Sequence, residues 1–218
     1  MNYRAVLFDL DGTLLDTLTD LADSTNAALR SLGFPTHPRE SYQQFVGDGV
    51  ERLIQRALPV ERRDAATVAA CGRCMRKEYG DRWAATTRPY AGIPELLDRL
   101  TDRRMPMAVL SNKPEEFTRL CVAQLLPGWK FAAVVGAGPA LPKKPDPSGA
   151  RQIAAELGVA PGECLYLGDT NTDMQTAAAA GMFAVGALWG FRTADELAAS
   201  GARVLLKSPL DLLPLLDG

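Results

Sequence analysis

Four short polar segments carry the side chains of this chain that could do chemistry. They are Asp9-Leu10-Asp11-Gly12-Thr13, Ser111-Asn112-Lys113, Lys143-Lys144-Pro145-Asp146-Pro147 and Gly168-Asp169-Thr170-Asn171-Thr172-Asp173. Brought together, they offer four carboxylates, one hydroxyl and at least one lysine. Carboxylates that lie close together repel one another unless a cation neutralises them. Oxygen ligands without Cys or His at metal-binding spacing favour Mg²⁺, which usually pairs with a phosphate.

Short apolar stretches precede these segments and predict the strands that position them. Strands are expected at residues 4–8, 107–110, 132–135, 165–167, 183–185 and 204–206. From residue 89 onward they alternate with helical patterns, which predicts an α/β fold with a Rossmann-like parallel sheet covered on both faces. Ligands of such sheets bind at the carboxyl ends of the strands, so the four segments are expected to share one crevice.

The region between the first two strands has a different pattern. Apolar residues recur at helical spacing over 18–32, 50–58 and 61–79, with no strand-like run between them. This predicts a Rossmann-like catalytic core made of residues 1–15 and 88–218, with an inserted small all-helical domain at residues 16–87. Hinges are expected near residues 15–17 and 83–88.

The polar segments resemble, in order, the four motifs of the haloacid dehalogenase superfamily. The matching residues are Asp9-x-Asp11-Gly12-Thr13-Leu14-x-Asp16, Ser111-Asn112, Lys144-Pro145-x-Pro147 and Gly168-Asp169-x-x-x-Asp173. One such motif is weak, but four in family order after four predicted strands make coincidence improbable. The resemblance implies a Mg²⁺-dependent phosphatase whose helical insertion forms a small cap domain.

The resemblance also implies a role for each carboxylate. Asp9 would attack the substrate phosphorus and form an aspartyl-phosphate, and Asp11 would act first as general acid and then as general base. Magnesium would be held by the Asp9 side chain, the Asp11 backbone carbonyl and Asp169, with Asp173 acting directly or through a water.

The remaining motif residues are expected to bind the phosphoryl group. Ser111, the backbone amide of Asn112 and Lys144 would hold its oxygens. Gly12 and Thr13 are expected to lie against the same phosphate. Lys113 and Lys143 are neighbouring rivals, but only Lys144 immediately precedes the Pro-Asp-Pro segment of the family pattern.

A glycine pair in the insertion points to the substrate. Gly47 and Gly49 stand beside the start of a predicted helix, where free backbone amides can meet an anion. An ordinary glycine turn before a helix fits the spacing equally well. The stretch Phe45 to Arg52 is similar to the cap segment of phosphoglycolate phosphatases, which makes 2-phosphoglycolate the expected substrate.

Several alternatives stay open on the sequence. The chain could hydrolyse another ester (a sugar phosphate, a nucleotide or pyrophosphate), or act as a β-phosphoglucomutase-like phosphomutase. It could also be a non-catalytic binding protein that keeps the fold. Taken singly, Asp9 to Gly12 fits a calcium-type turn, Ser111 or Asp169 a helix cap, and Lys144 a solvated loop lysine.

Charge and hydropathy narrow the class of partner. The formal net charge of −2 arises from 24 basic and 26 acidic residues without a long run of one sign. This pattern argues against nucleic acid or an anionic membrane as partner and leaves a small phosphorylated metabolite.

The chain start does not resemble a secretory signal, so a cytoplasmic protein is expected. The uncharged stretch Met174 to Phe191 is interrupted by glycines and predicts a buried helix, a turn and a buried strand. A monomer and a homodimer are equally compatible with the sequence.

Overall fold

The computed structural model describes residues 2–217. The chain forms two compact units, one made of Met1–Leu15 and Pro89–Gly218 and the other of Asp16–Arg88. It passes between them at β2 (Leu15–Asp16) and β3 (Arg88–Pro89), which pair as a two-stranded sheet.

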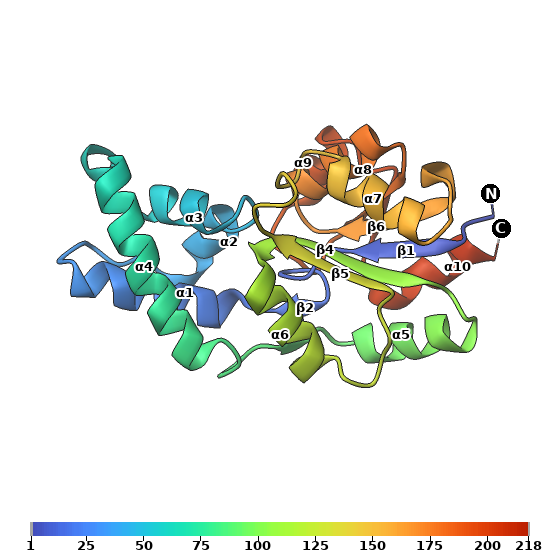
Figure 1. Ribbon diagram of the computed structural model, residues 1–218, viewed down its shortest axis with the longest axis horizontal. Helices are drawn as coiled ribbons and strands as arrows, with labels where there is room; N and C mark the ends of the chain where they lie inside the picture. The colour runs from blue at the N-terminus through green and yellow to red at the C-terminus, as the bar shows by residue number, and fades with distance from the viewer. Residues whose placement is uncertain (1, 218) are drawn as a thin grey trace. The chain divides into compact units, whose positions relative to one another are not determined.

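The first unit is built on a parallel six-stranded sheet (Figure 1). Its strands are β1 (Ala5–Phe8), β4 (Met107–Pro114), β5 (Ala133–Ala137), β6 (Cys164–Gly168), β7 (Phe183–Ala187) and β8 (Val204–Leu206). They are ordered β5-β4-β1-β6-β7-β8, and every neighbouring pair is parallel. The predicted fold class and all six predicted strands are confirmed.

Helices cover both faces of this sheet. They are α5 (Ile93–Asp102), α6 (Glu115–Leu125), α7 (Ser148–Glu156), α8 (Asn171–Ala180), α9 (Ala194–Ala199) and α10 (Leu213–Leu216), with 3-10 turns at Pro161–Glu163 and Pro209–Leu212. Figure 1 shows α7, α8 and α9 on one face and α5 and α6 on the other. This arrangement buries the strands on both sides and explains their nearly continuous apolar sequences.

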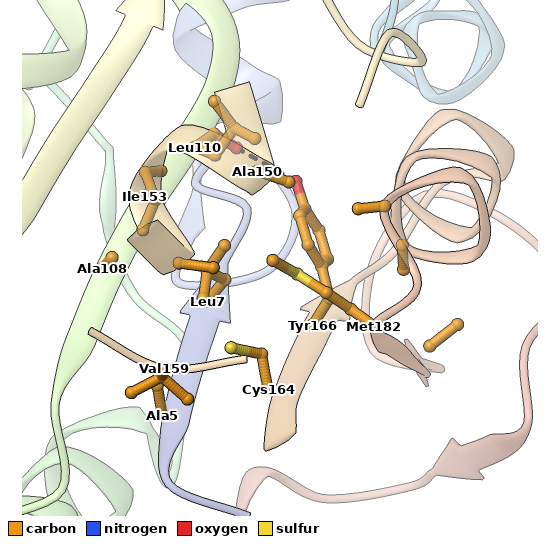
Figure 2. Close-up of a cluster of buried hydrophobic side chains, with 14 of the residues drawn as sticks. Ala5, Leu7, Ala108, Leu110, Ala150, Ile153, Val159, Cys164, Tyr166 and Met182 are labelled. Carbon is orange, nitrogen blue, oxygen red and sulfur yellow. Dashed lines mark hydrogen bonds between the residues drawn. The ribbon is translucent and has the colours of Figure 1, made fainter. Parts of the chain in front are cut away.

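One apolar cluster fills the space beneath α7, α8 and α9 (Figure 2). Successive strand residues point to opposite faces, so Ala5 and Leu7 of β1 enter this cluster together with Tyr166 of β6. The Tyr166 hydroxyl donates to the backbone oxygen of Leu110 at 3.4 Å, which satisfies a buried polar group. Burying each large apolar side chain here stabilises the fold by about 1.5–3 kcal/mol. The strand ends that carry polar residues are therefore held in place by a close-packed apolar core.

The strand order places a switch point at β1. The chain runs from β1 outward to β4 and β5, then returns to the other side of β1 for β6, β7 and β8. Phe8, the last residue of β1, pairs with Val109 of β4 and with Leu167 of β6. Since ligands of open sheets bind at the carboxyl edge beside such a point, the residue after Phe8 is the expected centre of the site.

Strand β4 is longer than its sequence predicts. Its pairing with β5 becomes irregular between Leu110 and Pro114, but Pro114 still pairs with Ala137. Ser111 and its two successors therefore lie within the carboxyl end of β4, where the sequence predicted a loop. Polar residues are uncommon in a buried strand, and here they lie at the carboxyl edge of the sheet, where ligands of such sheets bind.

The uncharged stretch Met174 to Phe191 folds as predicted. Helix α8 ends at Ala180. Gly181 follows with a φ of 82°, the left-handed conformation typical of the residue after a helix, and β7 comes next. Within residues 2–217, the structure contains no helix with the length and apolar character needed to cross a membrane.

The second unit is all-helical. Its helices are α1 (Leu18–Ser31), α2 (Tyr42–Phe45), α3 (Val50–Ala57) and α4 (Ala65–Arg82), with 3-10 turns at Arg39–Ser41 and Val60–Arg62. Helix α4 begins later than its apolar pattern predicts because the Asp64 carboxylate accepts a hydrogen bond from the Thr67 amide at 2.9 Å and caps the helix there. Cys71 is buried in α4 and Cys74 half-buried, and all four cysteines are reduced.

A buried carboxylate joins the two ends of this unit. Asp20, in the first turn of α1, accepts hydrogen bonds from the backbone amides of Thr86 and Thr87 at 2.9–3.1 Å and from both their hydroxyls at 2.7 Å. Burial alone would raise the pKa of Asp20, but the donors of Thr87 and Thr86 hold the pKa below its ordinary value of 3.8. The segment predicted as the second hinge is thus fixed to α1.

Asp20→Ala is expected to lower the free energy of unfolding by about 3 kcal/mol, because it leaves the buried donors of Thr87 and the partly buried donors of Thr86 without their acceptor. Urea unfolding followed by circular dichroism measures this loss, with the exposed Asp23→Ala on the same helix as control. Because the folded-state pKa is lowered, the difference from wild type is expected to be constant above about pH 4 and to shrink as pH falls through the folded pKa. An equal loss in both variants would contradict the role of Asp20.

Candidate active site

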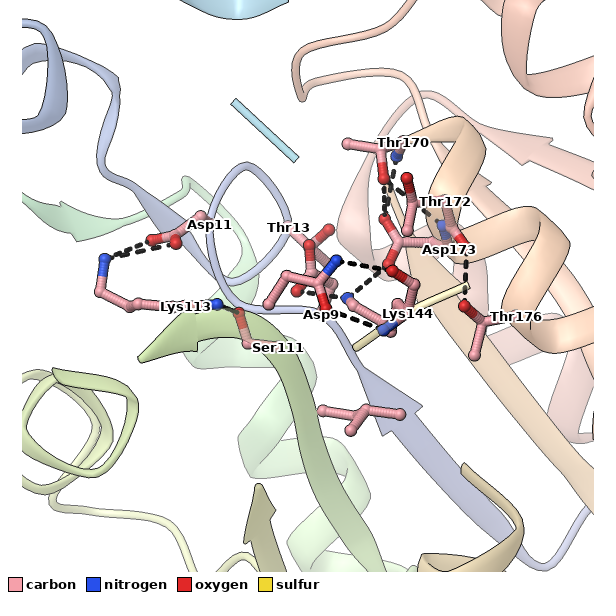
Figure 3. A network of polar contacts seen from close by, with 12 residues as sticks. Asp9, Asp11, Thr13, Ser111, Lys113, Lys144, Thr170, Thr172, Asp173 and Thr176 are labelled. Carbon is pink, nitrogen blue, oxygen red and sulfur yellow. Dashed lines mark hydrogen bonds and ion pairs between the residues drawn. The ribbon is translucent and has the colours of Figure 1, made fainter. Parts of the chain in front are cut away.

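Three buried carboxylates meet at the carboxyl edge of the sheet. Figure 3 shows two of them, Asp9 and Asp173, on either side of Lys144. Asp9 directly follows β1, Asp169 follows β6, and Asp173 lies in the first turn of α8. One oxygen from each lies within 4.8 Å of the other two. The fold therefore brings together three of the four residues that the sequence named as metal ligands.

Asp169 is held in place from two sides. Its Oδ1 accepts a hydrogen bond from the Thr13 hydroxyl and its Oδ2 from the Phe191 amide, both at 2.8 Å. Gly12, with a φ of 91°, and Gly190 let the backbone pass so close that a Cβ at either position would overlap Asp169. Gly12 and Thr13 thus lie against this carboxylate, and their expected contact with the phosphate stays a prediction.

The electrostatics of the cluster favour a cation. Burial, followed by the negative charge of Asp173, raises the pKa of Asp9 to about 7. Burial and then the charges of Asp9 and Asp173 also raise the pKa of Asp169 well above its ordinary value. A divalent cation among the three groups would favour their ionised forms, and carboxylate oxygens are the ligands that Mg²⁺ prefers. The residues present thus fit a magnesium ion.

Lys144 lies beside two of these carboxylates. Its Nζ is 2.8 Å from Asp9 Oδ1 and 2.6 Å from Asp173 Oδ1. Burial alone would lower the pKa of Lys144, but Asp173 and Asp9 hold this pKa well above its ordinary value. The other Asp173 oxygen accepts from the Thr170 amide and hydroxyl at 3.0 and 2.7 Å. Lys144 is therefore a fixed ammonium beside Asp9.

Asn112 fixes the backbone of Lys144. Its side-chain oxygen accepts from the Lys144 amide at 2.9 Å, and its side-chain nitrogen donates to the Lys144 carbonyl at 3.0 Å. The sequence assigned only the backbone amide of Asn112 to the site. The structure adds that the side chain of Asn112 connects the end of β4 to the loop before α7.

Asp11 does not join the carboxylate cluster through its side chain. Its two oxygens lie 3.0 and 3.3 Å from Nζ of Lys113, whose side chain is only 3% exposed. Ser111, on the same strand, accepts a hydrogen bond from the Lys113 amide at 3.3 Å. Sequence reasoning treated Lys113 only as a rival of Lys144. The available signal was its position two residues after Ser111, at the same predicted strand end.

The loop after β7 was also missed. Trp189 donates from Nε1 to the backbone oxygen of Thr13 at 2.9 Å, and Phe191 supplies the amide that binds Asp169. This loop has no charged residue before Arg192, so a search for chemistry-bearing side chains passes over it. Only the position of this loop, directly after the end of a predicted strand, could have indicated that it belongs to the site.

Gly47 and Gly49 lie in the other unit, just before α3, with φ values of 127° and 88°. Both angles belong to the region that glycine adopts most readily. Asp48 between them pairs with Arg56, which also donates to the backbone oxygen of Phe45. The anion-binding role of the two glycines stays a prediction.

Comparison with known proteins agrees with this geometry. Residues 6–187 match the haloacid dehalogenase-like hydrolase family. A phosphoglycolate phosphatase of Pseudomonas putida is 34% identical over 215 residues, covering 97% of this chain and 79% of the relative. A phosphoglycolate phosphatase of Xanthomonas campestris pv. campestris is 34% identical over 212 residues, covering 96% of this chain and 94% of the relative.

A solved structure from Lactobacillus delbrueckii subsp. bulgaricus aligns with a TM-score of 0.93 at 29% identity and covers 99% of both chains. The sheet, the order of the motifs and the carboxylate cluster agree with these similarities. The chain therefore belongs to the haloacid dehalogenase-like hydrolase family, among its phosphoglycolate phosphatase-like phosphatases.

Proposed function

We propose that this phosphatase hydrolyses 2-phosphoglycolate to glycolate and phosphate through an aspartyl-phosphate on Asp9, with Mg²⁺ as its cofactor. The observation that carries the proposal is the position of Asp9 at the end of β1, 2.8 Å from the Lys144 ammonium and beside Asp169 and Asp173. Relatives named phosphoglycolate phosphatase, aligned along nearly the whole chain, support the choice of substrate.

In the first half of the reaction an oxygen of Asp9 attacks phosphorus, and the bond between phosphorus and the ester oxygen breaks. Asp11 gives its proton to the departing oxygen, which leaves as the hydroxyl of glycolate. Lys144 stabilises the negative charge that the phosphoryl oxygens carry in the transition state. Ser111 and the Asn112 amide are proposed to bind the same oxygens.

In the second half Asp11, now a carboxylate, takes a proton from water. The water oxygen attacks phosphorus, the bond to Asp9 breaks, and inorganic phosphate is released. The ion pair with Lys113 holds the Asp11 carboxylate in one position, which supports its assignment as the acid–base residue.

Asp9, Asp169 and the Asp11 backbone carbonyl are proposed to hold the magnesium ion. When bound, it would neutralise charge between the carboxylates and an incoming phosphate. Both Asp173 oxygens already accept from Lys144 and Thr170, which supports contact through a water. The helical unit Asp16–Arg88 is proposed to serve as a cap, with Gly47 and Gly49 offering amides to the substrate.

The test is magnesium-dependent phosphate release from a panel of 2-phosphoglycolate, sugar phosphates, nucleotides and pyrophosphate, with Asp9→Asn as blank. The highest kcat/KM is expected for 2-phosphoglycolate. A higher value for another ester would reject the substrate and keep the chemistry. Isomerisation of a sugar phosphate with little release would indicate a mutase, and no reaction at all would indicate a binding protein.

A further inference from the structure

Two buried lysines serve the site from different elements. Lys144, in the loop before α7, pairs with Asp9 and Asp173, whereas Lys113, on β4, pairs with Asp11 (Figure 3). Both lysine side chains are only 3% exposed. Burying an ammonium costs free energy unless anions compensate it, so each lysine is held at its position by the carboxylates it meets. Lys144 lies at the phosphoryl end of the reaction, and Lys113 lies at the acid–base residue.

The position of Asp11 defines where the leaving group must lie. If Asp11 protonates the departing oxygen, that oxygen comes within hydrogen-bonding distance of the Asp11 carboxylate. The first carbon of the leaving group is one bond further on. Lys113 Nζ lies 3.0 Å from the same carboxylate, so a charged group on that carbon falls within reach of the ammonium.

We propose that Lys113 determines substrate specificity by pairing with a carboxylate carried on the carbon next to the leaving oxygen. The inference rests on the proposed function and assigns the recognition of the acid end of the substrate to this side chain. In 2-phosphoglycolate the carboxylate is attached to that carbon. An ammonium shared between Asp11 and the substrate carboxylate would also align the leaving oxygen with its acid.

The charge balance of the site supports this assignment. Asp9, Asp11, Asp169 and Asp173 are four carboxylates near the same strand ends, so an additional carboxylate from a substrate needs a cation directly beside it. Lys144 already contacts two of these carboxylates and lies by the phosphoryl position. Lys113 is the other buried lysine among the described residues, and it lies against Asp11, the proposed acid–base residue.

The test compares kcat/KM for 2-phosphoglycolate with kcat/KM for 2-phosphoglycolamide, which has nearly the same shape but carries a neutral amide in place of the carboxylate. Wild type is expected to prefer the acid. Lys113→Met is expected to reduce this preference about 10- to 100-fold, the range for losing a hydrogen bond to a charged group. An effect of the substitution that acts only through Asp11 changes kcat/KM for both substrates equally and therefore cancels in the ratio. The exposed Lys143→Met is the matched control and is expected to keep the wild-type ratio.

The outcomes separate the inference from the proposed function. A wild-type enzyme that prefers the acid, with the same ratio in Lys113→Met, would overturn the inference alone. A wild-type enzyme that does not distinguish the acid from the amide would also overturn the inference, whereas the panel of esters decides the proposed substrate separately. If Lys113→Met does not fold, Lys113→Gln provides the same ratio. Competitive inhibition of wild type by glycolate but not glycolamide is also expected, and equal inhibition would overturn the proposal without any variant.

Discussion

Asp9→Asn is expected to lower kcat by about 10⁴-fold or more, the scale seen when an enzyme loses its nucleophile. The amide keeps the volume of the side chain but cannot form the acyl phosphate. Phosphate release from 2-phosphoglycolate at saturating magnesium measures the effect. Asp102→Asn, an exposed position at the end of α5, is the matched control and is expected to retain full activity.

The same variant has an expected signature in stability. Burial and the charge of Asp173 raise the pKa of Asp9 to about 7, above the ordinary 3.8. The folded metal-free protein therefore binds a proton more tightly than the unfolded chain, and wild type loses stability as pH rises between these two values. Asparagine does not ionise, so metal-free Asp9→Asn is expected to be at least as stable as metal-free wild type above about pH 7. Loss of activity accompanied by unfolding would contradict this account, as would full activity.

Removal of magnesium with a chelator is expected to abolish turnover, and adding the ion back is expected to restore it. Metal that binds only the folded state also stabilises it, by about 2.7 kcal/mol at a concentration 100 times Kd. Thermal unfolding with and without the ion measures this difference. Asp169→Asn is expected to lose both the magnesium-dependent turnover and the stabilisation by magnesium, whereas Asp102→Asn is expected to keep both.

Protons should compete with the metal for the same carboxylates. Because the pKa of Asp9 in the metal-free site is raised to about 7, a proton on Asp9 is expected to compete with magnesium at and below this pH. Below it, affinity is expected to fall by up to about tenfold per pH unit for one competing proton. Calorimetric titration of metal-free protein between about pH 6 and pH 8 measures the change. An affinity that does not vary over this range, or turnover that persists in excess chelator, would refute the assignment of the metal to Asp9.

The local sequence determined much of this protein. Continuous apolar runs before Asp9 and Asp169 indicated strands buried on both faces, since a helix-covered parallel sheet requires such runs. The polar residues after those runs predicted a common edge because all parallel strands point the same way. Element type and order follow from short-range patterns of this kind. The exact ends of elements do not, as the Asp64 cap of α4 and the extension of β4 through Pro114 show.

Only the tertiary structure decided which side chains meet. Thr13 and Asp169 are 156 residues apart in the chain, and Asp11 and Lys113 are 102 apart. No periodicity within one segment encodes such a pair, because the contact depends on strand order, register and the close approach that glycine allows. The pairing of Lys113 with Asp11 thus appears only when β1 and β4 lie side by side. The residue types and their order predicted the chemistry, whereas the folded sheet assigned each lysine to its carboxylate.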